Sequence, residues 1–447
     1  MTEAVLARRL GTADAVIIGL GAMIGAGVFS AFGPAAKAAG SGLLLGLGIA
    51  ACVAFCNAVA SAQLAVQYPT SGGTYVYGRE RLSDWWGFVA GFGFVVGKTA
   101  SCAAMALTFA AYAVPGPAWV QRLAGALAVI ALTTANYHGI SRTAGLARLL
   151  VAGSIVALLV VVATIAASGE ADAGRIGSIS SLGGHGLYGL LQAAGLLFFA
   201  FAGYARIATL GEEVRDPAQT IPRAIPLALA IVVVLYLVVA VAALAAVGPD
   251  ALAASTAPLA TAVDAVGSAW ALPVVRAGAA IASLGALLAL IAGIGRTALA
   301  MARNGDLPRW LGSVHPRHRV PDHAELAVAA VVTVLVLSTD LRGAIGFSSF
   351  GVLLYYAVAN AAAYTQAPEY RRWPRALNVA GLVACVVLVV SLPAGAVVAG
   401  LAVLAVGIAG RAVALRRPGA SQAEPRDAER ADRDRPESRD HDRSRLG

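Results

Sequence analysis

One lysine in the middle of a long apolar stretch is the most chemically suggestive residue of this sequence. Lys98 is the only charged residue between Trp86 and Val114. If that stretch crosses a membrane, a lysine at its centre costs about 2.5–3.5 kcal/mol, so it should face the protein interior and serve a function. The alternative is a side chain that reaches the interface. Lys98 would be about 20 Å from either end of such a helix, which favours an internal site.

A cluster of glycines marks the first apolar stretch, Gly19-Leu-Gly-Ala-Met-Ile-Gly-Ala-Gly27. Glycine costs about 1 kcal/mol in a helix interior relative to alanine, and its ordinary use in membranes is close packing on one face. Gly25-Ala26-Gly27 runs around the helix, which favours an unwound stretch. Unwound backbone is tolerated in a membrane where it lines a cavity or meets a ligand. A dinucleotide-binding loop is excluded, because no strand–turn–helix context surrounds it.

A second interruption is predicted in the sixth apolar stretch, at Phe198-Phe-Ala-Phe-Ala-Gly-Tyr204. Interrupted segments at corresponding positions of two halves are typical of inverted-repeat transporters, whose site lies at the midplane of the bilayer. The first five spans would then form one repeat and the next five the other. This symmetry is inferred from the two interruptions, since the residues themselves show no convincing repeat.

The composition predicts an all-α polytopic membrane protein. The 447 residues are 59% hydrophobic and 13% charged, with a mean hydropathy of +0.76, and a soluble protein of this size needs far more polar surface. About twelve stretches of roughly 20 apolar residues are long enough to cross a bilayer. They begin near Asp14, Leu43, Trp86, Val120, Leu149, Tyr188, Ala224, Ala271, Glu325, Ala344, Leu377 and Pro393.

Charges between the spans predict the orientation. The net charge is +9, and the arginines gather before the first span and after every second one, which places both termini in the cytoplasm. The representative clusters are Arg8 and Arg9, Arg79 and Arg81, Arg142 and Arg148, Arg215 and Arg223, Arg303 and Arg309, and Arg371 and Arg372. We therefore expect a short cytoplasmic segment over residues 1–13, a transporter domain over 14–415 and a disordered charged cytoplasmic tail over 416–447.

Four sets of residues carry a family resemblance. Gly21-Ala-Met-Ile-Gly-Ala-Gly-Val-Phe29 resembles the first-helix signature of the amino acid–polyamine–organocation permeases. The other matching segments, in the order of that family, are Pro69–Tyr75, Phe198–Tyr204 with Gly211–Pro217 and Ile221–Ile225, and Ala300–Pro308. The resemblance covers about Asp14 to Leu415. It implies a leucine-transporter-type fold of five plus five inverted helices with two more, in which helices 1 and 6 are interrupted.

The resemblance also implies which residues bind the substrate. An amino acid presents a carboxylate, to which the N–H groups of Gly25, Ala26 and Gly27 could donate hydrogen bonds at a helix start. Its ammonium would meet carbonyls at Ala22, Met23 and Ala202. In the same family Phe199 is placed as an aromatic gate, for which ordinary packing is the alternative. By resemblance to the arginine/agmatine antiporters of the family, Lys98 would border the pocket of the substrate side chain. The full set is Ala22, Met23, Gly25, Ala26, Gly27, Lys98, Phe199, Ala202 and Leu290.

Leu290 and Lys98 bear on the substrate and on coupling. Arginine carriers of the family clamp the guanidinium between aromatic rings, and the helix-eight ring aligns with Leu290, so a neutral amino acid is predicted. Sodium-coupled relatives bind the ion partly through hydroxyl groups of helix eight. The inner half of the eighth span here offers only the hydroxyl of Thr297, so a sodium site is poorly supplied with ligands. Residues 149–167 contain no lysine, unlike some proton-coupled relatives. Lys98 is then the candidate for proton coupling, and exchange without coupling is the alternative.

The sequence also bears on functions other than transport of an amino acid. A polyamine or organic-cation antiporter is disfavoured by Lys98, and a nutrient sensor on the same scaffold stays open. An enzyme is not expected, because the histidines lie in loops, span ends or the tail, away from any nucleophile and base. No cofactor, metal or nucleic-acid partner is expected, and the four cysteines are interpreted as packing residues. State-dependent salt bridges among Arg206, Glu212, Glu213, Arg215 and Arg303, or a merely solvated loop, are both consistent with the sequence.

Overall fold

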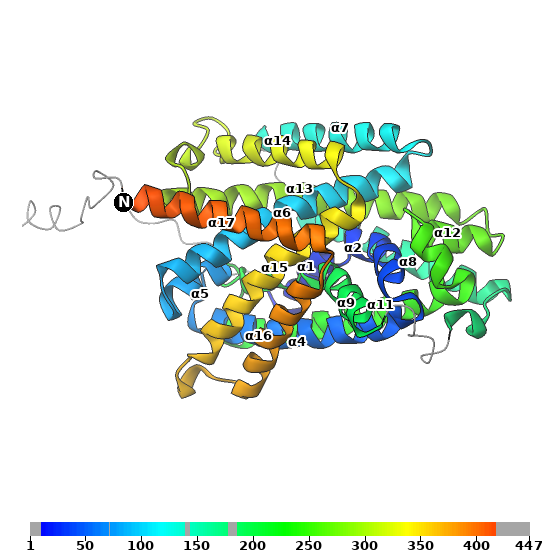
Figure 1. The fold of residues 1–447 in the computed structure, drawn as a ribbon, viewed down its shortest axis with the longest axis horizontal. Helices are drawn as coiled ribbons and strands as arrows, with labels where there is room; N and C mark the ends of the chain where they lie inside the picture. The colour runs from blue at the N-terminus through cyan, green and yellow to red at the C-terminus, as the bar shows by residue number, and fades with distance from the viewer. Residues whose placement is uncertain (1–9, 71, 139–143, 178–185, 417–447) are drawn as a thin grey trace, which may run out of the picture. The chain divides into compact units, whose positions relative to one another are not determined.

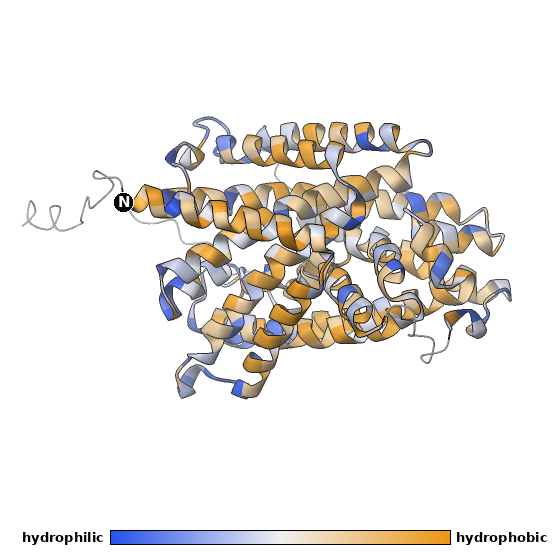
Figure 2. Ribbon diagram, in the orientation of Figure 1, coloured by the Kyte–Doolittle hydropathy of each residue, from blue (hydrophilic) through white to orange (hydrophobic). Residues whose placement is uncertain are grey.

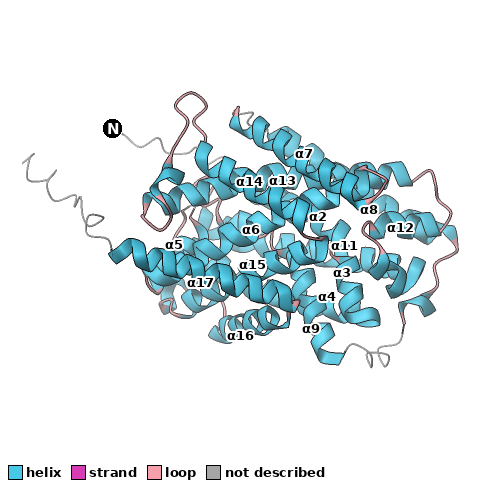
Figure 3. Cartoon of the chain, turned by 45° about the horizontal axis from the view of Figure 1, so that its top comes forward, coloured by secondary structure: helices cyan, strands magenta, loops and turns pink. Residues whose placement is uncertain are grey.

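The computed structural model describes residues 10–70, 72–138, 144–177 and 186–416. Within these ranges the chain is built of helices, and Figure 3 shows no strand in them. One isolated parallel bridge joins Leu10 to Val214. The expected segment 1–13 lies mostly outside the described residues, and the expected charged tail lies outside them beyond Arg416.

The helices are named here in chain order, as labelled in Figure 1. They are α1 (Thr12–Met23), α2 (Ala26–Ser30), α3 (Phe32–Ala39), α4 (Leu43–Gln67), α5 (Gly73–Arg81), α6 (Asp84–Ala113), α7 (Ala118–Tyr137), α8 (Ala144–Ser168), α9 (Gly186–Phe201), α10 (Ala205–Ala208), α11 (Pro217–Ala254), α12 (Pro258–Ala265), α13 (Leu272–Arg303), α14 (Asp322–Ser338), α15 (Leu341–Tyr364), α16 (Arg375–Ser391) and α17 (Ala394–Arg416).

The expected membrane spans coincide with helices. Nine helical runs in the described residues are long and apolar enough to cross a membrane, and α9 and α16 are shorter apolar helices. Figure 2 shows hydrophobic residues along most of these helices and hydrophilic residues gathered toward loops and helix ends. The last two expected spans, which begin near Leu377 and Pro393, are separate helices, because α16 ends at Ser391 and α17 begins at Ala394. The prediction of an all-α polytopic membrane protein is therefore confirmed.

Two groups of four helices organise the first of the chain's two compact units, which spans Met1–Ala405. In one group, α6, α7, α13 and α14 pack on one another, and Figure 1 shows α7 and α14 side by side. In the other, α1 and α4 each pack on α11, and the fourth member is the interrupted sixth span, whose halves are α9, packed against α4, and α10, packed against α1 and α11. The second unit, Val406–Gly447, begins within α17. Both interrupted helices belong to the group that contains α4 and α11.

The first interruption falls where the glycine cluster predicts it. Helix α1 ends at Met23, Ile24 and Gly25 leave the helical conformation, and α2 begins at Ala26. Ala31 keeps helical dihedral angles between α2 and α3, and its N–H donates to the carbonyl of Gly27 at 2.8 Å. The chain from Ala26 onward therefore acts as the second half of one interrupted helix.

The second interruption is confirmed in the sixth span. Helix α9 ends at Phe201, and the turn Ala202–Tyr204 separates it from α10. The two interruptions meet without side chains between them. A Cβ on Gly203 would overlap the carbonyl of Ala22 and lie 2.6 Å from the nitrogen of Met23, and a Cβ on Gly27 would lie 2.6 Å from the Cα of Ala200. Glycine is needed at both positions because backbone touches backbone.

Helix α6 is held close to α15 by a similar contact of small residues. A Cβ on Gly97 would lie 3.0 Å from the Cα of Gly351, and the hydroxyls of Ser101 and Ser348 share a hydrogen bond of 2.6 Å. This packing fixes the middle of α6, where Lys98 lies, against a helix outside both four-helix groups.

Candidate functional site

Lys98 lies at the interruption of the sixth span. Its ammonium nitrogen donates to the carbonyl of Ala202 at 3.5 Å, and the hydroxyl of Tyr356 on α15 donates to the same oxygen at 3.4 Å. Lys98 is partly accessible, whereas Ala202 and Tyr356 are buried. Two residues predicted from the sequence are thus brought together, and their contact joins the two four-helix groups.

The carbonyl at the end of α1 already has two donors. The oxygen of Met23 accepts the N–H of Gly25 at 2.8 Å and the hydroxyl of Tyr236 at 2.7 Å. Of the three predicted N–H donors, Gly25 is therefore engaged within the turn. Ala26 and Gly27 start α2, where a helix has no carbonyl one turn earlier to accept their N–H groups.

Tyr236 on α11 was not predicted from the sequence. Its side chain is fully buried, and its hydroxyl also lies 3.2 Å from the carbonyl oxygen of Ala200 near the end of α9. Its ring packs against Phe201 with centroids 5.2 Å apart. The signal available in the sequence was a polar hydroxyl in an otherwise apolar span, because a buried tyrosine hydroxyl usually has a partner.

Phe199 and Leu290 are placed beside the interruptions. Three phenylalanines lie at the end of α9. Phe198 packs on Tyr356 and Phe201 on Tyr236, whereas Phe199 has no aromatic contact among the described residues. Leu290 is partly buried on α13, one helical turn after Ala286, whose Cβ would lie 3.0 Å from a Cβ on Gly25. Helix α13 therefore passes the first interruption with the face that carries Leu290.

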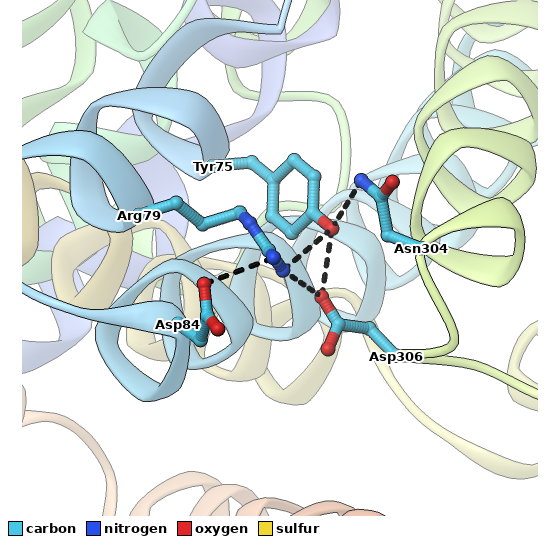
Figure 4. A network of polar contacts seen from close by, with 5 residues as sticks. All are labelled: Tyr75, Arg79, Asp84, Asn304 and Asp306. Carbon is cyan, nitrogen blue, oxygen red and sulfur yellow. Dashed lines mark hydrogen bonds and ion pairs between the residues drawn. The ribbon is translucent and has the colours of Figure 1, made fainter. Parts of the chain in front are cut away.

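A separate polar network lies at the ends of α5, α6 and α13 (Figure 4). The hydroxyl of Tyr75 donates to Asp306 Oδ2 at 2.7 Å, and Asn304 Nδ2 donates to the Tyr75 oxygen at 2.8 Å. Arg79 bridges Asp306 at 3.1 Å and Asp84 at 2.9 Å. Tyr75 and Asp306 come from two of the segments that carry the family resemblance, so those distant segments meet in space.

Charge and burial stabilise this network in one protonation state. Burial, and then the hydrogen bond to Asp306, raises the pKa of Tyr75 to about 12, so the phenol keeps its proton. Burial lowers the pKa of Arg79, but Tyr75, Asp306 and Asp84 raise it by more, and the guanidinium stays charged. The side chain of Asp306 is 2% exposed and that of Asp84 66%. Asp306 is therefore the centre of the network.

Two of the charged residues considered for gating, Glu213 and Arg215, lie at a junction with the N-terminal segment. Leu10 donates its N–H to the carbonyl of Glu213 at 3.1 Å and accepts from Arg215 at 2.9 Å. This ties the start of α1 to the loop after α10. Salt bridges among Arg206, Glu212, Glu213, Arg215 and Arg303 stay a prediction, and the ion pairs described above use Arg79 instead.

Comparisons with known proteins place the chain in a family. The family model "Amino acid permease" matches residues 14–414. An uncharacterized transporter of Mycobacterium tuberculosis is 60% identical, over 90% of each chain. The branched-chain amino acid permease BcaP of Bacillus subtilis is 26% identical over 85% of each chain. Cationic amino acid transporter 7 of Arabidopsis thaliana is 28% identical over 78% of this chain and 64% of the relative.

These matches cover the same residues as the resemblance found in the sequence, and they concern permeases rather than enzymes. The interrupted first and sixth spans, the helical architecture and the family match agree over one transporter domain. The chain is a multi-pass membrane transporter that belongs to the amino acid permease family of the amino acid–polyamine–organocation superfamily.

Proposed function

We propose that the protein is a secondary active transporter of neutral amino acids in the cell membrane, with both termini in the cytoplasm. Transport would proceed by alternating access, in which the group that holds α1, α4 and α11 moves against the group of α6, α7, α13 and α14 around a site at the interruptions. The contact between Lys98 and the Ala202 carbonyl carries this proposal, because it places a titratable group of one helix group on the interrupted backbone of the other.

The two ends of the amino acid are assigned to different halves of the interrupted helices. The N–H groups of Ala26 and Gly27 receive the carboxylate, aided by the positive end of the helix dipole, which is worth about 0.3–1 kcal/mol and up to about 2 when partly buried. The carbonyls of Ala22 and Ala202 receive the ammonium. The Met23 carbonyl can join them only by giving up one of its two present donors. Phe199 closes over the bound substrate.

A neutral side chain suits the residues around the interruptions. Leu290 offers an apolar contact, and the positive charge of Lys98 repels a cationic substrate. Among the relatives, one is named for branched-chain and another for cationic amino acids, so names alone do not decide between the classes. A polyamine or organic-cation antiporter, or a nutrient sensor on this scaffold, is the competing function, and Lys98 disfavours the cationic one.

Lys98 is also the residue we propose for proton coupling. A protonated Lys98 donates to Ala202 and holds the two helix groups together at the site. Loss of the proton weakens that contact and frees the carbonyl for the substrate ammonium. Movement of substrate and proton would thereby be linked, and without such linkage the protein would work by exchange alone.

The test is uptake into proteoliposomes. Purified protein is reconstituted and offered a panel of radiolabelled neutral and cationic amino acids, agmatine and putrescine, with and without a pH gradient. We expect neutral amino acids to accumulate when the gradient is present. Arginine or agmatine outcompeting every neutral amino acid would contradict the proposed class, and a protein that binds but never transports would be a sensor.

Coupling is tested with Lys98→Met, and Lys37→Met is the matched control because Lys37 is the other lysine of the chain and is exposed at the end of α3. We expect Lys98→Met to lose gradient-driven accumulation while it keeps exchange, and Lys37→Met to behave as wild type. Unchanged gradient-driven accumulation by Lys98→Met would remove Lys98 from the coupling step.

A further inference from the structure

Interrupting two helices inside a membrane leaves carbonyls without their usual donors. The last carbonyls of a helix have no intrahelical donor. Inside a bilayer, water can supply a donor only where the carbonyl faces a cavity, and elsewhere another protein group must supply it. Met23 and Ala200 lie at the ends of α1 and α9, and both are buried. The Met23 carbonyl keeps one local donor, the N–H of Gly25 at 2.8 Å, so its second lone pair and the carbonyl of Ala200 are open to donors from elsewhere in the chain.

A single hydroxyl serves both of them. The Tyr236 oxygen lies 2.7 Å from the Met23 oxygen and 3.2 Å from the Ala200 oxygen, so its proton can be shared between the ends of the two interrupted helices. The side chain is fully buried and its ring is held against Phe201. The hydroxyl is thus fixed at the point where the two interruptions cross.

Tyr236 reaches the interruptions from a different side than Lys98 does. Helix α11 packs against α1 and α4, whereas α6 packs against α13 and α15. Lys98 and Tyr356, on α6 and α15, contact the carbonyl of Ala202 instead. The Met23 and Ala200 carbonyls are consequently turned toward α11, while the start of α2 lies toward α6 and α13 and the Ala202 carbonyl toward α6 and α15.

We infer that Tyr236 is the positioning residue of the transport site. Its hydroxyl ties the ends of α1 and α9 together and orients the interrupted backbone, so that the groups facing the substrate keep a fixed spacing and both interrupted helices move as one body. Tyr236 itself does not contact the substrate. The role in substrate binding rests on the proposed function, whereas the tie between the helices does not.

The experiment compares Tyr236→Phe with Tyr112→Phe in the full-length protein. Tyr112 is a matched control, because its hydroxyl is also fully buried and donates to a carbonyl of α2, that of Phe29, at 2.7 Å. A third variant replaces Tyr236 with 4-aminophenylalanine, which returns an N–H donor at the same ring position. Amide hydrogen exchange is followed in peptides covering residues 19–27 and 198–206, and substrate affinity is measured with the best amino acid of the uptake panel.

Tyr236→Phe should speed amide exchange in both peptides by about five- to tenfold and weaken substrate binding by a similar factor, as expected for a buried carbonyl that loses its donor. The 4-aminophenylalanine variant should restore both to within about twofold. Tyr112→Phe should leave the 198–206 peptide unchanged. A purely structural role would not produce rescue of affinity by a returned donor.

Two results would overturn the inference. Unchanged amide hydrogen exchange in the two peptides of Tyr236→Phe would show that this hydroxyl does not tie the helices together, whatever the protein transports. Faster amide hydrogen exchange in this variant with unaltered substrate affinity would show that Tyr236 does not position the substrate-binding groups. If the wild-type protein takes up no amino acid, the proposed function fails, and faster exchange in both peptides of Tyr236→Phe, reversed by 4-aminophenylalanine, would still support the tie.

Discussion

Adding one methyl group at Gly203 should stop transport. A Cβ at this position would overlap the carbonyl of Ala22 and lie 2.6 Å from the nitrogen of Met23. Ordinary van der Waals contacts of a carbon atom are about 3.5–4.0 Å. Gly203→Ala therefore requires the two interruptions to move apart by about 1 Å or more. The obstruction is backbone, so rotation of a side chain cannot relieve it.

The expected size follows from the cost of overfilling a packed interior. Inserting a methylene where side chains can adjust costs about 1–3 kcal/mol, and a clash between two backbones belongs at the upper end of that range. Since about 1.4 kcal/mol corresponds to a factor of ten, uptake by Gly203→Ala should fall by about a hundredfold if the strain is expressed at the site.

The assay is initial-rate uptake in proteoliposomes, normalised to inserted protein. Gly48→Ala on α4 is the matched control, because a Cβ there meets nothing within 4 Å, and alanine is about 1 kcal/mol more favourable than glycine in a helix. We expect both variants to insert and to elute as a single species in detergent, with normal uptake by Gly48→Ala alone. Wild-type uptake by Gly203→Ala would refute the close crossing of the two interruptions.

Three further predictions concern other parts of the protein. Leucine at Gly27, whose Cβ would lie 2.6 Å from the Cα of Ala200, should abolish uptake without preventing insertion, and normal uptake would argue against the proposed site. Asp306→Asn should lower the free energy of unfolding in detergent by about 1–3 kcal/mol, because Tyr75 and Arg79 lose the negative charge of their buried acceptor. Asp84→Asn, at a side chain 66% exposed, should cost under about 1 kcal/mol, and equal effects would contradict the central place of Asp306. Partial burial, followed by the charges of His315, His138 and Arg317, lowers the pKa of His318 in the folded protein. As the pH falls, this residue therefore takes up a proton in the unfolded chain before it does so in the folded protein. The melting temperature should fall as the pH drops below about 6.5. His318→Asn should reduce that dependence, and an identical pH profile would show that His318 is not its source.

Much of the fold could be predicted because a membrane restricts what a sequence can form. Apolar length gives the spans, and the rule that every backbone group needs a partner gives meaning to glycines such as Gly25 and Gly27. The same reasoning singled out Lys98, since a charge at mid-span is costly unless it has a role. The structure then placed the first interruption at Ile24 and Gly25 and the second after Phe201.

The partners of those groups could not be predicted, because they depend on which helices meet. Tyr236 lies 213 residues from Met23 in the chain, and Asp306 lies 231 residues from Tyr75. Each looks like ordinary packing or a loop residue when taken alone. A hydroxyl in an apolar span indicates that a partner exists, but only the crossing of α11 with the interrupted helices identifies Met23 and Ala200 as that partner.

The donors found at the interruptions also rank the carbonyls as acceptors for a substrate ammonium. Met23 has two short hydrogen bonds, at 2.7 and 2.8 Å, whereas Ala202 has two long ones, at 3.5 and 3.4 Å. Charge-assisted hydrogen bonds prefer about 2.7–2.9 Å, so an ammonium would improve on the contacts of Ala202 and merely replace those of Met23. Substrate binding would then be an exchange of hydrogen bonds at Ala202, in which Lys98 is displaced as it loses its proton. Such an exchange gives moderate affinity, because each new bond removes an old one, and moderate affinity suits a carrier that must release its substrate on the other side.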